Sequence, residues 1–296
     1  MSGTLARVGC RGVAGPTIGL FAINSHACAA PAAAARIAGL AERLGYDSLW
    51  AGEHVVVPSP RVEPSPMEPE EPILDPLVAL AHVAAHTERV RLGTGVIILP
   101  QRNPLVLAKQ VASLDVLSGG RLIFGLGVAY LEPEMRAIGV PMEGRGARAD
   151  EYLAAMRALW DQEAPAYQGR HVRFEGVDAH PRPVQTPLPV VVGGHTRAAH
   201  RRAARHADGW YGFLLGLRAM AEQRGLMDAA VAEAGRDRPL HVSVTPARRL
   251  DPEVVRAYAE LGVDRLIVAP PAGLSLDELV EFVEANAPAR LRAARL

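Results

Sequence analysis

The chain has 296 residues, 49% hydrophobic and 22% charged, with 32 Lys and Arg balanced by 32 Asp and Glu. A formal charge of zero gives no net attraction to nucleic acid or to an anionic membrane, so neither is expected as a partner. No stretch approaches the ~18 uninterrupted apolar residues of a membrane span. Cys10 and Cys28 form neither a disulfide framework nor a zinc-binding spacing. We therefore expect no metal site and a cytoplasmic protein with free thiols.

Short apolar runs alternate with helical patterns along almost the whole chain. The eight strand candidates are Thr17–Ala22, Ser48–Glu53, Arg91–Leu99, Arg121–Val128, Leu188–Gly194, Asp208–Phe213, His241–Pro246 and Asp264–Pro270. Helical patterns begin near Pro31, Pro76, Pro104, Arg145, Thr196, Leu217, Pro252 and Ser275. Several of these starts carry a proline or a capping residue, which is typical of a helix N-terminus.

Continuous Val, Ile and Leu strands that are each followed by a helix indicate a parallel sheet buried on both faces. Eight such units in about 280 residues predict an α/β fold, a (β/α)8 TIM barrel, with insertions after strands two and four. A doubly wound open sheet is the alternative, but the Gly-x-Gly-x-x-Gly turn expected after its first strand is absent. We expect one domain over residues 1–296, of which residues 1–16 form a flexible N-terminal extension. Function should lie on the loops that follow the strands.

The segment VVVGGHTR delivers two glycines and then Thr196, a plausible helix cap, at the end of the fifth strand. Free backbone N–H groups at a helix start, without a Cβ in the way, form an anion-binding site. A tight turn that uses glycine for its backbone alone would give the same pattern. The position late in the barrel favours phosphate binding.

Ionisable side chains also follow the first two strands. Glu53 and His54 end strand two, and His26 follows strand one. A histidine near its ordinary pKa suits proton transfer, so His54 and His26 are candidates for contact with the substrate. A loop histidine bonded to the backbone would look the same in the sequence.

These stretches resemble the bacterial-luciferase-like oxidoreductases, and more narrowly the branch that uses coenzyme F420, a deazaflavin. The similarity runs from about Ile18 to Gly212 and includes AERLGYDSLWAGEHVVVP, RLGTGVIILPQRNP, FEGVDAHPRPVQTPLPVVVGGHT and AARHADGW. The resemblance implies a non-prolyl cis peptide between Gly95 and Val96, at the end of strand three, that presses on the back of the cofactor ring. It would also explain why an apolar strand contains glycine, which adds nothing to packing.

The resemblance further implies which residues form the site. Glu53 and His54 match an acidic–His pair near the reacting edge of the ring, with Tyr130 as a further catalytic candidate. The implied cofactor-binding residues are Thr94, Gly95, Val96, Val128, Ala129, Tyr130, Gly193, Gly194, His195, Thr196 and Arg197. Two positions depart from the family: sugar-phosphate dehydrogenases carry Glu where Tyr130 stands, and most members carry Gly where Ala129 stands.

Three functions remain open from the sequence. The first is hydride transfer between coenzyme F420 and a small organic substrate, with His54 or Tyr130 handling a proton. The second is an FMN-dependent monooxygenase that uses reduced flavin and O2. Flavin users of this family often place Arg after strand four, where this chain has Val128 and Ala129, so the deazaflavin is favoured. The third is a cofactor-binding protein without activity. The family resemblance also implies a homodimer.

Overall fold

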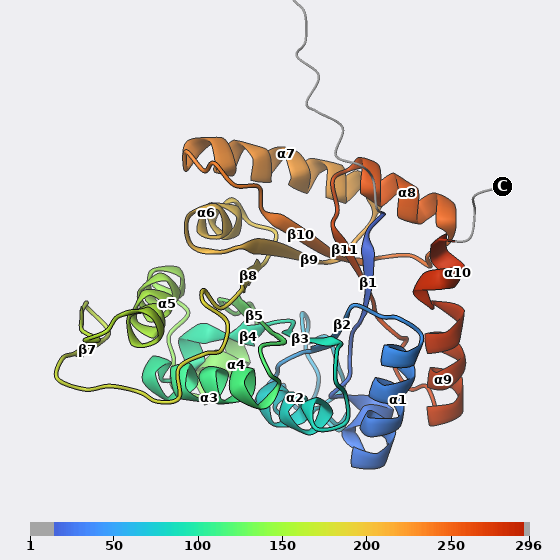
Figure 1. Cartoon of the computed structure of the whole chain (residues 1–296), viewed down its shortest axis with the longest axis horizontal. Coiled ribbons are helices and arrows are strands. Elements are labelled where there is room, and N and C mark those ends of the chain that lie inside the picture. The colour runs from blue at the N-terminus through green and yellow to red at the C-terminus, as the bar shows by residue number, and fades with distance from the viewer. Residues whose placement is uncertain (1–14, 293–296) are drawn as a thin grey trace, which may run out of the picture.

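The computed structural model describes residues 15–292, and they form a closed barrel of parallel strands surrounded by helices (Figure 1). The barrel strands are β1 (Thr17–Leu20), β2 (Ser48–Ala51), β3 (Arg91–Thr94) with its continuation β4 (Ile97–Ile98), β5 (Leu122–Gly127), β8 (Val190–Gly193), β9 (Gly209–Leu215), β10 (His241–Pro246) and β11 (Arg265–Val268). Their order is β3-β2-β1-β11-β10-β9-β8-β5, and pairing of β3 with β5 closes the ring. The predicted (β/α)8 barrel is confirmed, and the open sheet is excluded.

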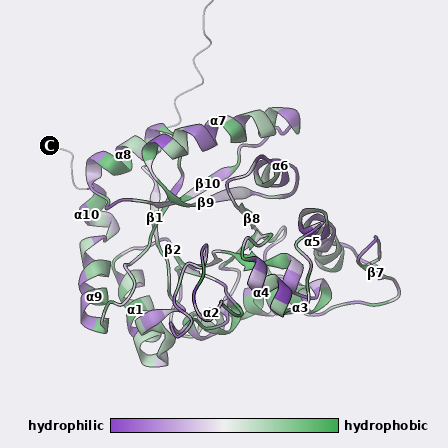
Figure 2. Ribbon diagram, turned by 180° about the vertical axis from the view of Figure 1, so that it is seen from behind, coloured by the Kyte–Doolittle hydropathy of each residue, from purple (hydrophilic) through white to green (hydrophobic). Residues whose placement is uncertain are grey.

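The helices cover the outside of the barrel. They are α1 (Pro31–Arg43), α2 (Pro76–Ala84), α3 (Pro104–Leu117), α4 (Glu132–Ala137), α5 (Arg145–Asp161), α6 (Arg197–His206), α7 (Leu217–Glu233), α8 (Pro252–Glu260), α9 (Leu276–Ala285) and α10 (Pro288–Arg292), with 3-10 turns η1 (His26–Ala29) and η2 (Leu99–Gln101). Asp75 and Asn103 cap α2 and α3 through their side chains. Hydrophobic and hydrophilic residues alternate along the outer helices (Figure 2).

Two insertions lengthen the connections at the predicted places. A segment without helix or strand, residues 52–75, follows β2. After β5 come α4, α5 and an antiparallel hairpin of β6 (Tyr167–Gln168) and β7 (Arg173–Phe174), which lies at the edge of the molecule beyond α5 (Figure 1). Of the expected N-terminal extension, residues 1–14 lie outside the described residues.

Within residues 15–292, no helix combines the length and the apolar character needed to cross a membrane.

A small inner core fills the barrel, separate from the larger core between strands and helices. Its buried members are Trp50, Ile123, Val191, Tyr211 and Ile267. The indole of Trp50 is fully buried and donates its Nε1–H to Ser48 Oγ at 2.8 Å. A Cβ on Gly93 would lie 2.4 Å from Trp50 Cδ2, closer than real Cβ contacts come. Gly93 is therefore explained by packing, because the indole occupies the space of a side chain on β3.

The amino-terminal end of the barrel is closed by an ion pair beneath Trp50. Arg265 Nε donates to Asp47 Oδ2 at 2.6 Å, and its guanidinium lies 5.7 Å from the centroid of the Trp50 ring. Both the side chain of Arg265 and the indole are buried, so this end is packed. Function is left to the opposite end, where the strands meet their long loops.

Candidate active site

The third barrel strand carries a bulge at its carboxyl end. Gly93 pairs with Ile123 and Ile97 pairs with Leu126, so three residues of this strand face two residues of β5. The Gly95–Val96 peptide within the bulge is cis, as the family resemblance implied. Such a one-residue insertion breaks the ladder locally and turns the backbone into the barrel mouth. Gly95 and Val96 are half-buried, so this backbone faces the mouth.

Glycines on neighbouring strands make room for the bulge. A Cβ on Gly127 would lie 2.8 Å from Val96 Cγ2, and one on Gly193 would lie 2.9 Å from Val96 Cγ1. On β5, a Cβ on Gly125 would lie 1.9 Å from the Thr94 carbonyl oxygen. The glycines of these strands thus accommodate the displaced third strand, and Val96 fills the space they leave.

Thr94 holds the bulge rather than facing the site. Its hydroxyl donates to the Gly125 carbonyl oxygen at 2.7 Å and accepts from the Gly125 N–H at 2.8 Å. The residue is fully buried. The Thr94 hydroxyl is thus satisfied by β5, and a place for Thr94 in the expected ring platform would depend on its backbone. Gly95 and Val96 remain at the mouth.

Glu53 is bound from several sides by donors of the following segment. Its carboxylate accepts from the Ile98 N–H, from Gln101 Nε2 at 3.0 Å and from Arg102, whose Nε lies 2.8 Å away. Burial raises the pKa of Glu53, while the Arg102 charge opposes that rise. Arg102 also pairs with Asp75 Oδ2 at 2.6 Å. The predicted catalytic role of Glu53 is therefore not supported by the geometry: the carboxylate anchors the segment after the bulge.

His54 is held by a carboxylate that the sequence did not reveal. Its Nδ1 lies 2.9 Å from Glu134 Oε2, and the second carboxylate oxygen accepts from the Val55 N–H at 2.6 Å. The Glu134 side chain is fully buried, and that of His54 is 11% exposed. Because the carboxylate only accepts, the neutral imidazole carries its proton on Nδ1 and keeps a lone pair on Nε2.

The lone pair on His54 Nε2 faces Tyr130. The phenol oxygen lies 3.3 Å from Nε2, and the two rings meet edge to face with centroids 5.9 Å apart. Burial and the nearby Glu134 charge raise the pKa of Tyr130, so the phenol stays protonated and donates to the imidazole. The structure thus brings together two of the predicted catalytic residues in a Glu134–His54–Tyr130 chain that ends at the surface of the mouth.

The glycine loop after β8 leads into α6 as predicted. Gly194 has φ +120°, a conformation that L side chains rarely adopt, and a Cβ there would lie 3.2 Å from that of Ala199. Thr196 caps α6 by accepting from the Ala199 N–H at 3.2 Å. The other N–H groups of a helix's first turn have no intrahelical acceptor, so they can bind an anion. His195 and Arg197 lie exposed beside them.

The loop after β5 contains a second unusual backbone conformation. Ala129 has φ +74°, which favours glycine and fits the family's usual choice at this position. Its carbonyl oxygen accepts from Arg145 Nε at 3.3 Å, while Arg145 Nη1 donates to Met142 at 3.0 Å. The sequence places Val128 and Ala129 here without a cation. The structure brings a guanidinium to the same loop from the start of α5.

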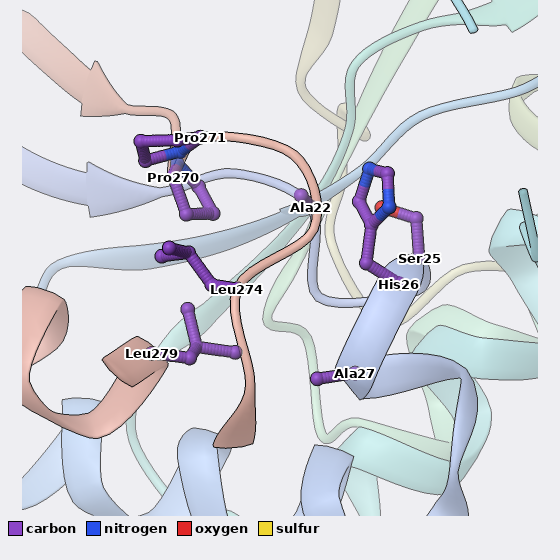
Figure 3. A pocket seen from close by; sticks show the side chains of 8 residues that line it. All are labelled: Ala22, Ser25, His26, Ala27, Pro270, Pro271, Leu274 and Leu279. Atoms are coloured by element: carbon purple, nitrogen blue, oxygen red, sulfur yellow. The ribbon is translucent and has the colours of Figure 1, made fainter. Parts of the chain in front are cut away.

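His26 stands apart from the His54 chain in the contacts that the structure shows. His26 lines a cavity of about 10 Å³ between the loops after β1 and β11. Pro270, Pro271 and Leu274 line the same cavity from the loop after β11 (Figure 3). That space holds about one water molecule. The His26 N–H donates to the Pro72 carbonyl oxygen at 3.0 Å, and its φ is +50°. The cavity is too small for an organic substrate, so the predicted substrate contact of His26 depends on the open mouth.

Glu134, Arg102 and Arg145 are the site residues that sequence reasoning missed. Each lies in or directly after a helical element rather than at a strand end. The partners of Glu134 and Arg102 are also distant in the chain, at 80 and 49 positions. A usable signal existed for Glu134 alone, as an acidic residue in the first turn of α4 directly after the Tyr130 loop.

Comparison with known proteins agrees with this architecture. The sequence matches the family described as luciferase-like monooxygenase over residues 4–293. It is 35% identical over 275 residues to an uncharacterized protein of Mycobacterium tuberculosis, a match that covers 90% of this chain and 95% of that protein. Among solved structures, the monooxygenase RslO1 from Streptomyces bottropensis has a TM-score of 0.74 at 23% identity, covering 92% of this chain and 97% of that one.

A second solved structure has the same overall similarity. An F420-dependent secondary alcohol dehydrogenase in complex with an F420-acetone adduct has a TM-score of 0.74 at 16% identity, covering 94% of this chain and 99% of that one. At these identities the solved structures support the fold alone. The family match and the closed barrel with its bulged third strand lead to one conclusion: the chain belongs to the luciferase-like monooxygenase family, whose members are oxidoreductases and monooxygenases.

Proposed function

We propose that this protein is a deazaflavin-dependent oxidoreductase that interconverts an alcohol and a carbonyl compound. The observation that carries the proposal is the Glu134–His54–Tyr130 chain, because such a reaction needs one positioned proton donor and acceptor beside the carbon that changes oxidation state. Coenzyme F420 would supply the hydride acceptor or donor. The fold similarity to an F420-dependent alcohol dehydrogenase is consistent with this choice.

The described residues fit a planar cofactor with a phosphate. Gly95 and Val96 offer a half-buried backbone surface for a ring, and Gly194 leaves open the space in front of the first turn of α6. Thr196 fixes that turn through its capping bond. Arg145 contributes a guanidinium that donates to the carbonyl oxygens of Ala129 and Met142, so its charge is available to a phosphate.

Each residue of the chain then has a distinct task. In alcohol oxidation His54 Nε2 accepts the hydroxyl proton as the C–H hydrogen leaves with its electron pair, and in carbonyl reduction the imidazolium returns that proton. Glu134 fixes the imidazole tautomer and stabilises the positive charge that His54 gains. Tyr130 donates its hydroxyl hydrogen bond to Nε2 in the free enzyme. When a substrate binds, the phenol donates to the substrate oxygen instead. Glu53, with Arg102, positions the bulge.

Anaerobic titration of the purified protein with F420 and with FMN at one ionic strength tests the proposal. We expect micromolar or tighter deazaflavin binding and bleaching or recovery of its absorbance with secondary alcohols or ketones. Tight FMN binding with oxygen-dependent turnover, and no deazaflavin binding, would overturn it.

An FMN-dependent monooxygenase is the second candidate, and Arg145 is the observation that favours it. The absence of an arginine directly after strand four argued for the deazaflavin from the sequence, but Arg145 supplies a cation to the same loop. Titration of Arg145→Gln with both cofactors compares them: a loss of FMN affinity at least tenfold greater than the loss of F420 affinity would mark Arg145 as a flavin phosphate ligand.

We also propose that the protein is a homodimer. Val78 on α2 and Leu117 on α3 are each 69% exposed, and Val106 lies on the same helix as Leu117. The two helices pack side by side on the outside of the barrel. Exposed apolar side chains on adjacent helices are typical of an interface with a second copy.

A further inference from the structure

Large apolar side chains are exposed at the mouth of the barrel, where a polar surface would be expected. Val55 and Val56 follow β2, and Phe213 and Leu214 lie near the end of β9. Their exposed fractions are 54%, 44%, 37% and 54% respectively. We call these four residues the apolar collar. Exposed apolar groups that gather at a candidate site mark binding surfaces more often than chance.

A hydrogen bond and a ring contact place the collar next to the catalytic groups. The Val55 N–H donates to Glu134, the carboxylate that holds His54. The centroid of the Phe213 ring lies 5.2 Å from that of the Phe21 ring. Phe21 lies beside the bulge, because a Cβ on Gly95 would come 3.0 Å from Phe21 Cε2. One side of the collar is therefore bonded to the proton-transfer chain, and the other side packs on Phe21, which lies beside the bulge.

Leu214, an exposed residue of the collar, has an unusual backbone conformation. Leu214 has φ +52°, in the left-handed region that a leucine rarely occupies. Residues held in such conformations persist only where the surroundings enforce them, and they concentrate at ligand sites. Regular β geometry would not require this conformation, so β9 departs from it at the residue that presents leucine to the mouth.

The charged groups beside the collar already have partners or another task. Glu53 is bound by Arg102, and Glu134 is bound by His54 and the Val55 N–H. Arg145 lies at the Ala129 loop. His195 Nε2 accepts from the Phe213 N–H at 3.1 Å, and burial lowers the pKa of His195, so this imidazole offers no positive charge at neutral pH. A substrate with a carboxylate or phosphate would thus meet apolar surface without a dedicated counter-ion, which is costly because its charge would lose water.

We propose that the apolar collar selects a neutral substrate with an alkyl chain of several carbons, a medium-chain secondary alcohol or ketone, whose oxygen meets His54 while its chain covers the collar. This inference rests on the proposed oxidoreductase function. Sugar phosphates and carboxylated substrates are disfavoured for the same physical reason. Each methylene that leaves water for the collar should tighten binding about fourfold, until the collar is covered.

Calorimetric titration of 2-butanone, 2-hexanone and 2-octanone into protein saturated with the cofactor that it binds tests the collar without requiring turnover. Affinity should rise along the series, with an increasingly negative heat-capacity change, and a ketone ending in a carboxylate should bind at least tenfold more weakly than its neutral equivalent. No dependence on chain length, or equal binding of the carboxylated ketone, would overturn the proposal.

The variant Leu214→Asn ties the effect to the collar. Asparagine tolerates the left-handed conformation, so the protein should be as stable as wild type, or more stable, while 2-octanone binds about four- to tenfold more weakly. Val184→Asn is the matched control: Val184 is 58% exposed, and its neighbour Gln185 bonds to Leu122 at the start of β5, the opposite end of the barrel. Equal loss of affinity in both variants would contradict the collar.

The same experiment separates failure of the collar from failure of the proposed function. If ketones bind with the expected chain-length dependence but no hydride transfer follows with any cofactor, the collar stands and the reaction assignment fails. If turnover occurs without chain-length dependence in wild type, the reaction stands and the collar fails.

Discussion

His54 Nδ1 lies 2.9 Å from Glu134 Oε2, although the two residues are 80 positions apart in the chain. The carboxylate lies at the start of α4 and the imidazole lies just after β2, so the barrel itself brings the pair together. This pairing turns a histidine at a strand end into one with a defined tautomer.

His54→Ala should lower kcat by about 10²- to 10⁴-fold, because the variant lacks the group that accepts the proton of the substrate hydroxyl. Cofactor affinity should change little, since the His54 ring bonds to Glu134 and Tyr130 and not to the glycine loop after β8. Glu134→Gln should lower kcat less. The amide can still bond to Nδ1 and hold the ring in place, but by donating to Nδ1 it favours the tautomer with the proton on Nε2. Stopped-flow measurement of cofactor reduction with a saturating alcohol checks both. An unchanged rate in His54→Ala would move the proton-transfer role to Tyr130.

Gly194→Val should weaken cofactor binding at least tenfold without unfolding the barrel. A branched side chain cannot easily adopt φ +120°, and it would stand where an anion must approach the first turn of α6. Gly216→Val is the control, because Gly216 also precedes a helix after a barrel strand but has open space around it. Fluorescence titration measures both affinities. Equal affinity in wild type and Gly194→Val would refute the anion-site assignment.

Gly93→Ala should destabilise the protein by about 1–3 kcal/mol, because the new methyl group would overlap the Trp50 ring in a packed barrel interior. Gly225→Ala should stabilise it by about 1 kcal/mol, because that residue lies within α7 with nothing near its missing Cβ. Urea unfolding gives both free energies. The interpretation of Gly93 fails if its variant is as stable as that of Gly225.

Acid should destabilise the fold through His241. Burial lowers the pKa of this residue to about 4, with the charge of Arg265 acting in the same direction and Asp264 and Asp47 opposing it. In the unfolded chain the His241 imidazole takes up a proton near pH 6.5, whereas in the folded protein it stays neutral down to about pH 4. The free energy of unfolding therefore decreases as pH falls from about 6.5 towards 4. The loss should reach about 2 kcal/mol at pH 5.

His241→Gln should remove this part of the pH dependence, because glutamine does not titrate. Urea unfolding at pH 7 and pH 5 gives the comparison. The remaining slope comes from other groups, so the difference between the two proteins is the quantity that matters. Parallel slopes in wild type and variant would show that His241 does not contribute.

Sedimentation of Val78→Asp/Leu117→Asp at micromolar concentration should show a monomer where the wild type shows a dimer. Charges placed on both exposed helices would have to lose water in an interface without a partner. Ala229→Asp, at an exposed position on α7, should leave the dimer intact. A monomeric wild type would contradict the proposal outright.

The order of strands and helices was predictable because the barrel strands are short apolar runs and most of the helices that follow them begin with a proline or a capping residue. Asp75 and Asn103 illustrate this, since each cap depends only on residues two or three positions away. The interruption of strand three by Gly95 and Val96 came from the family resemblance and not from periodicity.

The polar network of the site was beyond sequence reasoning because its partners are distant in the chain. Glu53 and His54 are adjacent, yet one is bound by Arg102 and the other by Glu134. Their different tasks follow from which side of the backbone each side chain leaves, and only the closed barrel decides that. Thr94 shows the same limit, because nothing in the sequence indicates that its hydroxyl turns towards Gly125.

The buried indole of Trp50, above the Arg265–Asp47 pair, leaves the barrel with a single entrance. A cofactor seated on the Gly95–Val96 bulge would lie deeper than a substrate held at Val55 and Leu214, and both must pass the same rim. Because both ligands use one opening, the deeper ligand must bind first and dissociate last. The order of binding and release in steady-state turnover, with product leaving before the cofactor, would then follow from how the interior is filled rather than from any affinity between the two ligands.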